Sequence, residues 1–189
     1  SEMCIRDSFN YRYIMKIEIN MPIVIAIVGP SGSGKTTMAN IMAENGIPTI
    51  VSFTTRPMRD GETNGKEHWF VTPEDKPDAS EMIAYTNFGG YEYWATLQQT
   101  KHKICTYVID EKGLIYLKEK FPNSFIVFSV YLDRNINDRI GCGVDEKRCK
   151  RDSDRTEIPL KEYDYIIHNN YSLEEFEEKI KQLTIDLLK

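Results

Sequence analysis

Apolar residues along the chain gather into short runs that alternate with amphipathic stretches. The clearest run, residues 23–28 (Ile-Val-Ile-Ala-Ile-Val), ends at Gly29 and is typical of a parallel strand buried on both faces. Residues 35–44 have helical composition, and Gly46 follows them as an expected C-terminal cap. Further strands are predicted at 48–53, 104–109, 125–132 and 163–168.

Three more helices complete the pattern. Residues 111–120 predict a helix that stops before Pro122, and residues 135–140 begin another. Ser172 is expected to cap a C-terminal helix, because Glu174 and Glu175 in its first turn favour the helix dipole. Apolar residues then recur on one face of this helix, at Phe176, Ile180, Leu183 and Leu187. Strands that alternate with helices predict a three-layer α/β/α fold around a parallel sheet.

Three parts of the chain do not follow this alternation. The segments at about 54–100 and about 141–159 break it, and prolines keep any helix at 73–80 short. Residues 1–20 fit no element, and the first eight resemble translated adapter sequence, so we expect the folded domain to be 21–189. Met15 and Met21 are the two candidate start residues.

Composition narrows the class of protein. The chain has 189 residues, 41% of them apolar and 28% charged, which suits one globular domain with a small insert. A net charge of -5 without a Lys/Arg-rich block argues against a nucleic-acid partner, and no apolar run is long enough for a membrane span. Four cysteines without metal-ligand spacing predict free thiols. We therefore expect a cytoplasmic protein, a monomer or homodimer, without nucleic-acid or membrane partners.

Residues 29–36, Gly-Pro-Ser-Gly-Ser-Gly-Lys-Thr, match the phosphate-loop pattern GxxxxGK[ST] between a predicted strand and a predicted helix. The glycines allow backbone N–H groups to converge on phosphate oxygens, and the helix directs its positive end at the anion. Lys35 is expected to reach the β- and γ-phosphates of ATP, and Thr36 to ligate Mg²⁺. The residues predicted to hold the ATP phosphates are Gly29, Ser31, Gly32, Ser33, Gly34, Lys35, Thr36 and Thr37.

Residues 52–71 carry a second pattern, with Ser52, Thr54, Thr55, Arg56, Arg59, Gly61, Glu62, Gly65 and Phe70 at fixed spacing. Two arginines three residues apart offer forked donors suited to a phosphate dianion. Together with the phosphate loop, this segment closely resembles the guanylate kinase family, whose pattern is S-x-T-T-R-x-x-R-x-G-E-x-x-G-x-x-Y-x-F. The resemblance covers roughly residues 22–188.

The resemblance implies a P-loop NTPase fold and ATP-dependent phosphorylation of a nucleoside monophosphate, with GMP or dGMP the first choice. It makes 54–100 an acceptor-binding insert and 141–159 a lid. Arg56, Arg59 and Tyr93 would bind the acceptor phosphate. His68 stands where the family usually has tyrosine, and an imidazole can still donate to phosphate. Two residues complete the implied site: Ser52 contacts the base, and Asp110 serves the base or a metal-linked water.

Two positions depart from the family at the base and metal sites. Ala84 falls where the family carries the glutamate that reads guanine, and alanine cannot accept those hydrogen bonds. A shifted register would offer Glu81 instead. Val108 replaces an aspartate common in the family, which bears on magnesium binding. The identity of the base therefore stays open at this point.

Arginines gather in and before the lid, where phosphoryl transfer needs positive charge around the transferred group. They are Arg134, Arg139, Arg148, Arg151 and Arg155. The resemblance makes Arg148 a transition-state arginine and Arg139 an adenine-side or phosphate-side contact. With Lys35 and Mg²⁺, these groups would support direct, in-line transfer from ATP without a protein nucleophile.

Two alternatives remain from the sequence. The same architecture serves kinases for other (deoxy)nucleoside monophosphates or for ribosyl phosphates, and the alanine at position 84 allows this. Guanylate-kinase-like domains also act as non-catalytic binding modules, which tend to lose phosphate-loop residues. Gly34, Lys35 and Thr36 are intact here, which favours an enzyme.

Overall fold

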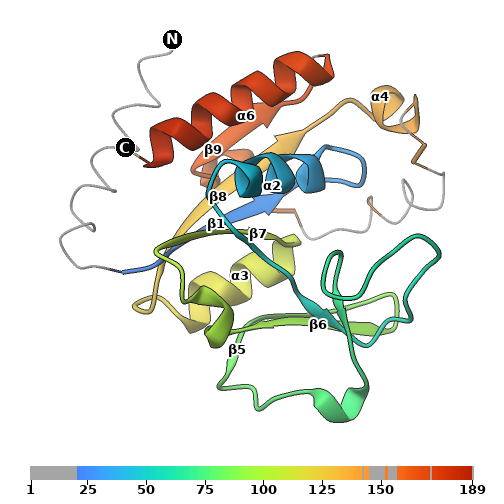
Figure 1. The fold of residues 1–189 in the computed structure, drawn as a ribbon, viewed down its shortest axis with the longest axis vertical. Coiled ribbons are helices and arrows are strands. Elements are labelled where there is room, and N and C mark those ends of the chain that lie inside the picture. The colour runs from blue at the N-terminus through green and yellow to red at the C-terminus, as the bar shows by residue number, and fades with distance from the viewer. Residues whose placement is uncertain (1–20, 142, 145–151, 153–156, 171, 189) are drawn as a thin grey trace.

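The computed structural model describes residues 21–141, 143–144, 152, 157–170 and 172–188. A five-stranded sheet in the order β2-β7-β1-β8-β9 forms its centre, and every described pair in it is parallel (Figure 1). The strands are β1 (Ile23–Val28), β2 (Thr49–Ile50), β7 (Ile104–Val108), β8 (Ile126–Asp133) and β9 (Tyr165–His168). The parallel sheet predicted from the alternating pattern is thus confirmed.

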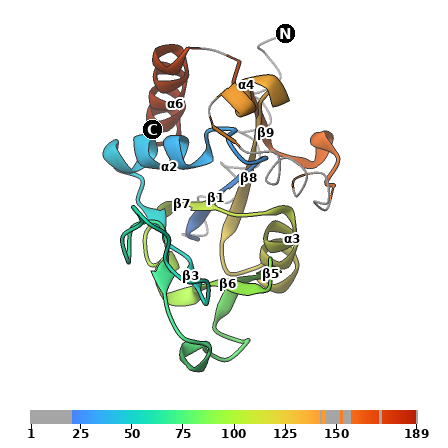
Figure 2. The same cartoon turned by 90° about the vertical axis from the view of Figure 1, so that its right-hand side faces the viewer.

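Strand β1 supplies both halves of the core because its side chains alternate between the two faces of the sheet. Ile23, Ile25 and Ile27 pack against helices α2 (Lys35–Glu44) and α6 (Leu173–Leu188). Val24, Ala26 and Val28 face helix α3 (Glu111–Lys120). Figure 2 shows α2 and α6 above the sheet and α3 below it. Burial on both faces explains why the sequence of this strand is continuously apolar.

The insert after β2 forms a smaller sheet of its own, in the order β4-β3-β6-β5. Its strands are β3 (Phe53–Thr54), β4 (Trp69–Phe70), β5 (Met82–Phe88) and β6 (Tyr91–Thr96), with 3₁₀ turns η1 (Pro73–Asp75) and η2 (Leu97–Thr100). Strands β5 and β6 form a hairpin around Gly89 and Gly90, whose φ angles of 62° and 82° suit a tight two-residue turn. Ile83, Ala84 and Ala95 from this hairpin join the core below the main sheet.

The prediction of a single strand at 48–53 was wrong. The chain pairs first with the main sheet, Ile50 opposite Tyr107, and then with the insert, Phe53 opposite Trp94. The segment, Pro-Thr-Ile-Val-Ser-Phe, reads as one short strand, but the hydrogen-bond partners change in its middle. Ser52 consequently lies at the junction of the two sheets.

The predicted helix ends are confirmed. Gly46 follows α2 with a φ of 97°, the left-handed conformation expected of a C-terminal cap. At α6, the Glu175 N–H donates to the Ser172 hydroxyl at 3.2 Å, and the Ser172 N–H donates to the Glu175 carboxylate at 3.0 Å. The remaining elements are α4 (Ile136–Gly141) and η3 (Leu160–Glu162). The last strand follows η3 and begins at Tyr165, two residues later than predicted. Among the described residues, no helix combines the length and apolar character that a membrane span requires.

Most of the predicted lid and the predicted extension at 1–20 lie outside the described residues. Arg148, Arg151 and Arg155 are among them.

Candidate active site

The phosphate loop, residues 29–36, joins the carboxyl end of β1 to the start of α2, the position where open α/β sheets bind ligands. Gly32 and Gly34 have φ angles of 74° and 103°. A Cβ atom on Gly32 would lie 2.4 Å from Val144 Cγ2, and one on Gly34 would lie 2.7 Å from Asn169 Nδ2. Both positions therefore need glycine for their backbone angles and for lack of space.

Lys35 folds back over this loop. Its ammonium group donates hydrogen bonds to the carbonyl oxygens of Gly29 and Pro30, both at 2.8 Å. The Ser33 hydroxyl lies buried inside the loop, with no hydrogen-bond partner among the described residues. Thr36 is exposed at the first turn of α2. The loop thus presents the Lys35 cation, the Thr36 hydroxyl and a helix N-terminus to one cavity, a donor set that suits phosphate oxygens.

Asn169 is a site residue that the sequence analysis missed. It follows β9, is only 6% exposed, and donates from Nδ2 to the Ser33 carbonyl oxygen at 2.8 Å. Its own N–H donates to the Asp133 carbonyl oxygen at 2.7 Å. The available signal was an amide side chain directly after a predicted strand, at the sheet edge that carries the phosphate loop.

Arg139 lies against the outer side of the phosphate loop. Its Nε donates to the Ser31 carbonyl oxygen at 2.7 Å, and its guanidinium forms an ion pair with Asp152. The Asp152 carboxylate also accepts hydrogen bonds from the Ser31 N–H at 2.9 Å and the Ser31 hydroxyl at 3.1 Å. Arg134 lies nearby and donates to the Gly32 carbonyl oxygen at 3.2 Å. Two of the predicted arginines therefore surround the loop.

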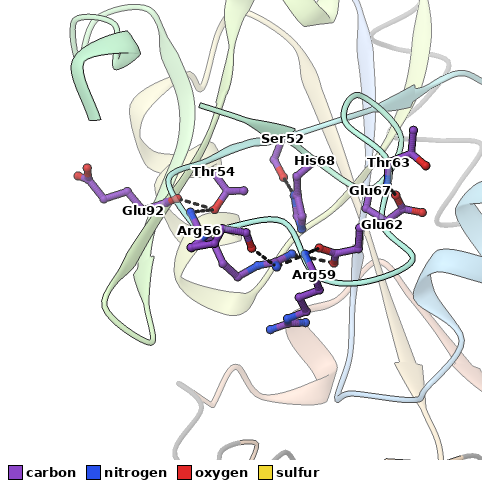
Figure 3. A network of polar contacts seen from close by, with 10 residues as sticks. Ser52, Thr54, Arg56, Arg59, Glu62, Thr63, Glu67, His68 and Glu92 are labelled. Carbon is purple, nitrogen blue, oxygen red and sulfur yellow. Dashed lines mark hydrogen bonds and ion pairs between the residues drawn. The ribbon is translucent and has the colours of Figure 1, made fainter. Parts of the chain in front are cut away.

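One carboxylate, that of Glu62, bonds the side chain of Arg56 and the backbone of Arg59, the two predicted acceptor arginines (Figure 3). Arg56 is 6% exposed and makes a two-pronged ion pair with Glu62, at 3.0 Å and 2.8 Å. The Arg59 N–H donates to the same carboxylate at 2.8 Å. The Arg56 guanidinium lowers the pKa of Glu62, so this carboxylate stays ionised at neutral pH. Glu62 belongs to the recognised pattern, but we had not assigned it a role.

His68 lies between Ser52 and the Arg56–Glu62 pair. Its Nδ1 is 2.8 Å from the Ser52 hydroxyl, and its ring meets Phe70 and Tyr93 edge-on. Figure 3 shows the ring extending from Ser52 toward the Arg56–Glu62 pair. Burial lowers the pKa of His68, and the Arg56 guanidinium adds to this effect. The imidazole is therefore neutral at pH 7.

Two adjoining cavities connect the phosphate loop with the acceptor arginines. The first is lined by residues from the loop, β5 and the carboxyl end of β7, including Lys35, Ala84, Thr86 and Asp110. The second is lined by Thr36, Arg56 and Arg59 among others. Five residues line both cavities: Ser52, His68, Phe88, Tyr93 and Val108. The fold thus brings the predicted acceptor residues to the same region as Lys35.

Asp110 lines the first cavity. Its Oδ1 accepts a hydrogen bond from the Gly113 N–H at 2.8 Å and so caps α3. Thr86 donates from its hydroxyl to the same carboxylate, 3.1 Å and 3.2 Å from the two oxygens. Ala84 is buried and lines this cavity, whereas Glu81 is exposed and does not. The shifted register that would have offered Glu81 is not adopted.

The described residues contain no group of three or more His, Cys, Asp or Glu side chains able to hold a metal ion together. Magnesium bound with a nucleotide takes few protein ligands and keeps waters and phosphate oxygens as the others. The exposed Thr36 hydroxyl at the start of α2 could serve as one such protein ligand.

Known proteins resemble this chain in sequence and in fold. The family model described as guanylate kinase matches residues 21–186. A guanylate kinase of Mesoplasma florum is 31% identical over 86% of the chain and 60% of its own length, and one of Lactococcus lactis is 30% identical over 85% and 86%. The chain spans less than two thirds of the first relatives it matches, 56% in the Protochlamydia amoebophila protein. The crystal structure of guanylate kinase from Anaplasma phagocytophilum shares the fold, with a TM-score of 0.65, 24% identity and 88% and 86% coverage.

Proposed function

The chain belongs to the guanylate kinase family, and from that membership we propose that it transfers the γ-phosphoryl group of ATP to GMP or dGMP. One observation carries the proposal. The cavity that contains Lys35 shares Ser52, His68 and Tyr93 with the cavity that contains Arg56 and Arg59. An ATP on the phosphate loop and a monophosphate on the arginines would therefore meet end to end, the arrangement that in-line transfer needs.

On the ATP side, the phosphate loop would hold the phosphates, and Lys35 would leave its two carbonyl partners to reach the β- and γ-oxygens. Thr36 would hold Mg²⁺, which would supply positive charge to neutralise the phosphates. Arg139 would act from the outer side of the loop, and Arg148, outside the described residues, would complete the positive charge around the transferred group.

On the acceptor side, Arg56 and Arg59 would bind the phosphate, because guanidinium groups match its oxygens in pairs. Glu62 keeps Arg56 in place before the acceptor arrives. His68 and Tyr93 would donate further hydrogen bonds. Ser52 and Asp110, which both line the cavity that contains Lys35, would face the base.

The experiment is a coupled ADP-release assay with ATP and a panel of nucleoside monophosphates and a ribosyl phosphate, with Lys35→Ala as control. We expect turnover with GMP and dGMP, and at least about a hundredfold loss in the Lys35→Ala protein, since the lysine neutralises charge in the transition state. Turnover with dTMP or the ribosyl phosphate, but not with GMP or dGMP, would replace the acceptor. Failure to bind ATP by calorimetry would instead favour a non-catalytic binding module.

We further propose a cytoplasmic location and a monomer or homodimer with ATP and the nucleoside monophosphate as partners. The support is the class of substrate, which is a cytoplasmic metabolite. Size-exclusion chromatography with light scattering distinguishes the two oligomeric states.

A further inference from the structure

We propose that the Thr86 hydroxyl, paired with Asp110, reads the base of the acceptor in place of the glutamate that this chain lacks. The inference rests on the proposed function and names the group that gives it guanine specificity. Three observations carry it: the row of paired residues in which Thr86 lies, the hydrogen bond that it makes with Asp110, and the apolar side chain at Ala84.

Thr86 lies at one end of a row that crosses the insert. Thr54 pairs with Tyr93, and Tyr93 pairs with Thr86, so the three residues lie side by side on β3, β6 and β5. Two interstrand spacings amount to about 10 Å. Arg56 follows Thr54 by two residues at the other end of the row. An acceptor with its phosphate on Arg56 would therefore extend past Tyr93 and place its base at Thr86.

The hydrogen bond between Thr86 and Asp110 determines what this pair offers a ligand. The threonine hydroxyl has one hydrogen, and it donates that hydrogen to the carboxylate. Its oxygen lone pairs then remain as acceptors. Asp110 accepts from Thr86 and from the Gly113 N–H, and an ionised carboxylate has about four acceptor positions, so it keeps capacity as well. The pair thus presents two adjacent acceptors to the cavity.

Two adjacent acceptors match two adjacent donors. Guanine offers N1–H and the 2-amino group next to each other, whereas adenine has an unprotonated N1 and a single amino group on that edge. Hypoxanthine keeps N1–H and lacks the amino group. A base without a matching donor leaves a buried acceptor unpaired, which is how polar sites discriminate. The pair therefore favours guanine over both other bases.

The position where the family carries its glutamate, and the nearest carboxylate before it on the chain, offer no acceptor to this cavity. Ala84 lies two residues before it on the same face of β5 and carries no polar atom. Glu81 is exposed and does not line the cavity. The hydrogen-bond acceptor that the family carries at position 84 is thus supplied two residues further along the strand, at position 86.

The test compares Thr86→Val, which keeps the shape and removes the hydroxyl, with Thr86→Ser, which keeps the hydroxyl. We would measure kcat/KM of the full chain for GMP, IMP and AMP, together with the KM for ATP. The valine protein should lose about 10- to 100-fold in kcat/KM with GMP and less with AMP, which lacks both N1–H and the 2-amino group, so that the GMP/AMP ratio falls at least about tenfold. The serine protein should keep the wild-type ratio within about threefold, because the hydroxyl remains.

A wild-type GMP/AMP ratio in the valine protein overturns the inference and leaves the proposed function intact. An unchanged KM for ATP shows that the valine protein is folded, and Thr86→Ala repeats the comparison if it is not. Wild-type protein that phosphorylates no guanine nucleotide overturns the proposed function itself, so the two failures are distinguishable.

Discussion

The Ser52 hydroxyl and Nδ1 of His68 lie 2.8 Å apart at the point where the two sheets of the protein meet. Because burial and the Arg56 guanidinium lower the pKa of His68, the ring is neutral near pH 7 and has only one N–H group. If Ser52 donates to Nδ1, the hydrogen of the ring is on Nε2, the side that faces the Arg56–Glu62 pair in Figure 3. Ser52 would then orient a donor for the acceptor phosphate as well as face the base.

The lowered pKa of His68 makes folding stability depend on pH. Below pH 6.5 the unfolded histidine takes up a proton, while the folded one stays neutral down to its lower pKa. Stability is therefore lost as the pH falls below about 6.5. The wild-type free energy of unfolding, measured with urea, should fall between pH 7 and pH 5. We expect His68→Gln to make this fall smaller by up to about 1 kcal/mol. The exposed His102→Gln protein should keep the wild-type slope, and equal slopes in all three proteins would contradict the account.

Glu62 should matter for acceptor binding although it carries the wrong charge to touch a phosphate. Glu62→Gln weakens the ion pair that holds Arg56, so we expect the acceptor KM to rise about tenfold with the KM for ATP unchanged. The loss of a charged hydrogen bond should also lower the free energy of unfolding by about 1–2 kcal/mol. That contribution is present above the ordinary pKa of a glutamate and is lost as the pH falls through the lowered pKa of Glu62.

The matched control for this prediction lies in the same loop. Glu67 is exposed and accepts a hydrogen bond from the Thr63 N–H at 2.8 Å, and no hydrogen bond joins it to Arg56 (Figure 3). Glu67→Gln removes the same charge from the loop. If it raised the acceptor KM as much as Glu62→Gln, net charge would be the cause, and the positioning of Arg56 would not.

The main sheet was predictable because its strands and helices differ in pattern. A strand buried on both faces has a continuous apolar sequence, and β1 shows this clearly. The insert was harder to predict. Strand β5 reads Met-Ile-Ala-Tyr-Thr-Asn-Phe, and its burial falls along its length from buried to exposed, so neither alternation nor a continuous run marks it. The change of sheet between β2 and β3 leaves no trace in hydrophobicity at all.

The site was predictable where its residues are close in sequence. The phosphate loop and the two arginines follow local spacing that their chemistry requires. The Thr86–Asp110 pair spans 24 residues, and the contact of Asn169 with Ser33 spans 136. Only the fold brings such groups together, and no local pattern in one sequence records it. These contacts therefore needed the structure.

Cys105 offers a probe of unfolding in the centre of the sheet. It is 1% exposed on β7, and burial raises the pKa of its thiol to about 12. Since the thiolate is the reactive form, iodoacetamide at pH 8 should modify Cys105 only after unfolding. The rate, followed by mass spectrometry of the peptide that contains Cys105, should rise with urea together with loss of circular dichroism. Rapid modification in the absence of urea would show that β7 opens locally.

Asn169 should couple the end of β9 to ATP binding. Removal of its side chain by Asn169→Ala leaves the Ser33 carbonyl oxygen without the amide that now donates to it at 2.8 Å. A buried acceptor without a partner costs about 1–3 kcal/mol, so the free energy of unfolding should fall by that amount. Because Ser33 belongs to the phosphate loop, the KM for ATP should rise several-fold while the KM for the acceptor stays within about twofold. Asn170→Ala, an exposed neighbour, should change neither quantity. Equal effects on both substrates would show that Asn169 supports the fold generally, without a particular role in holding the phosphate loop.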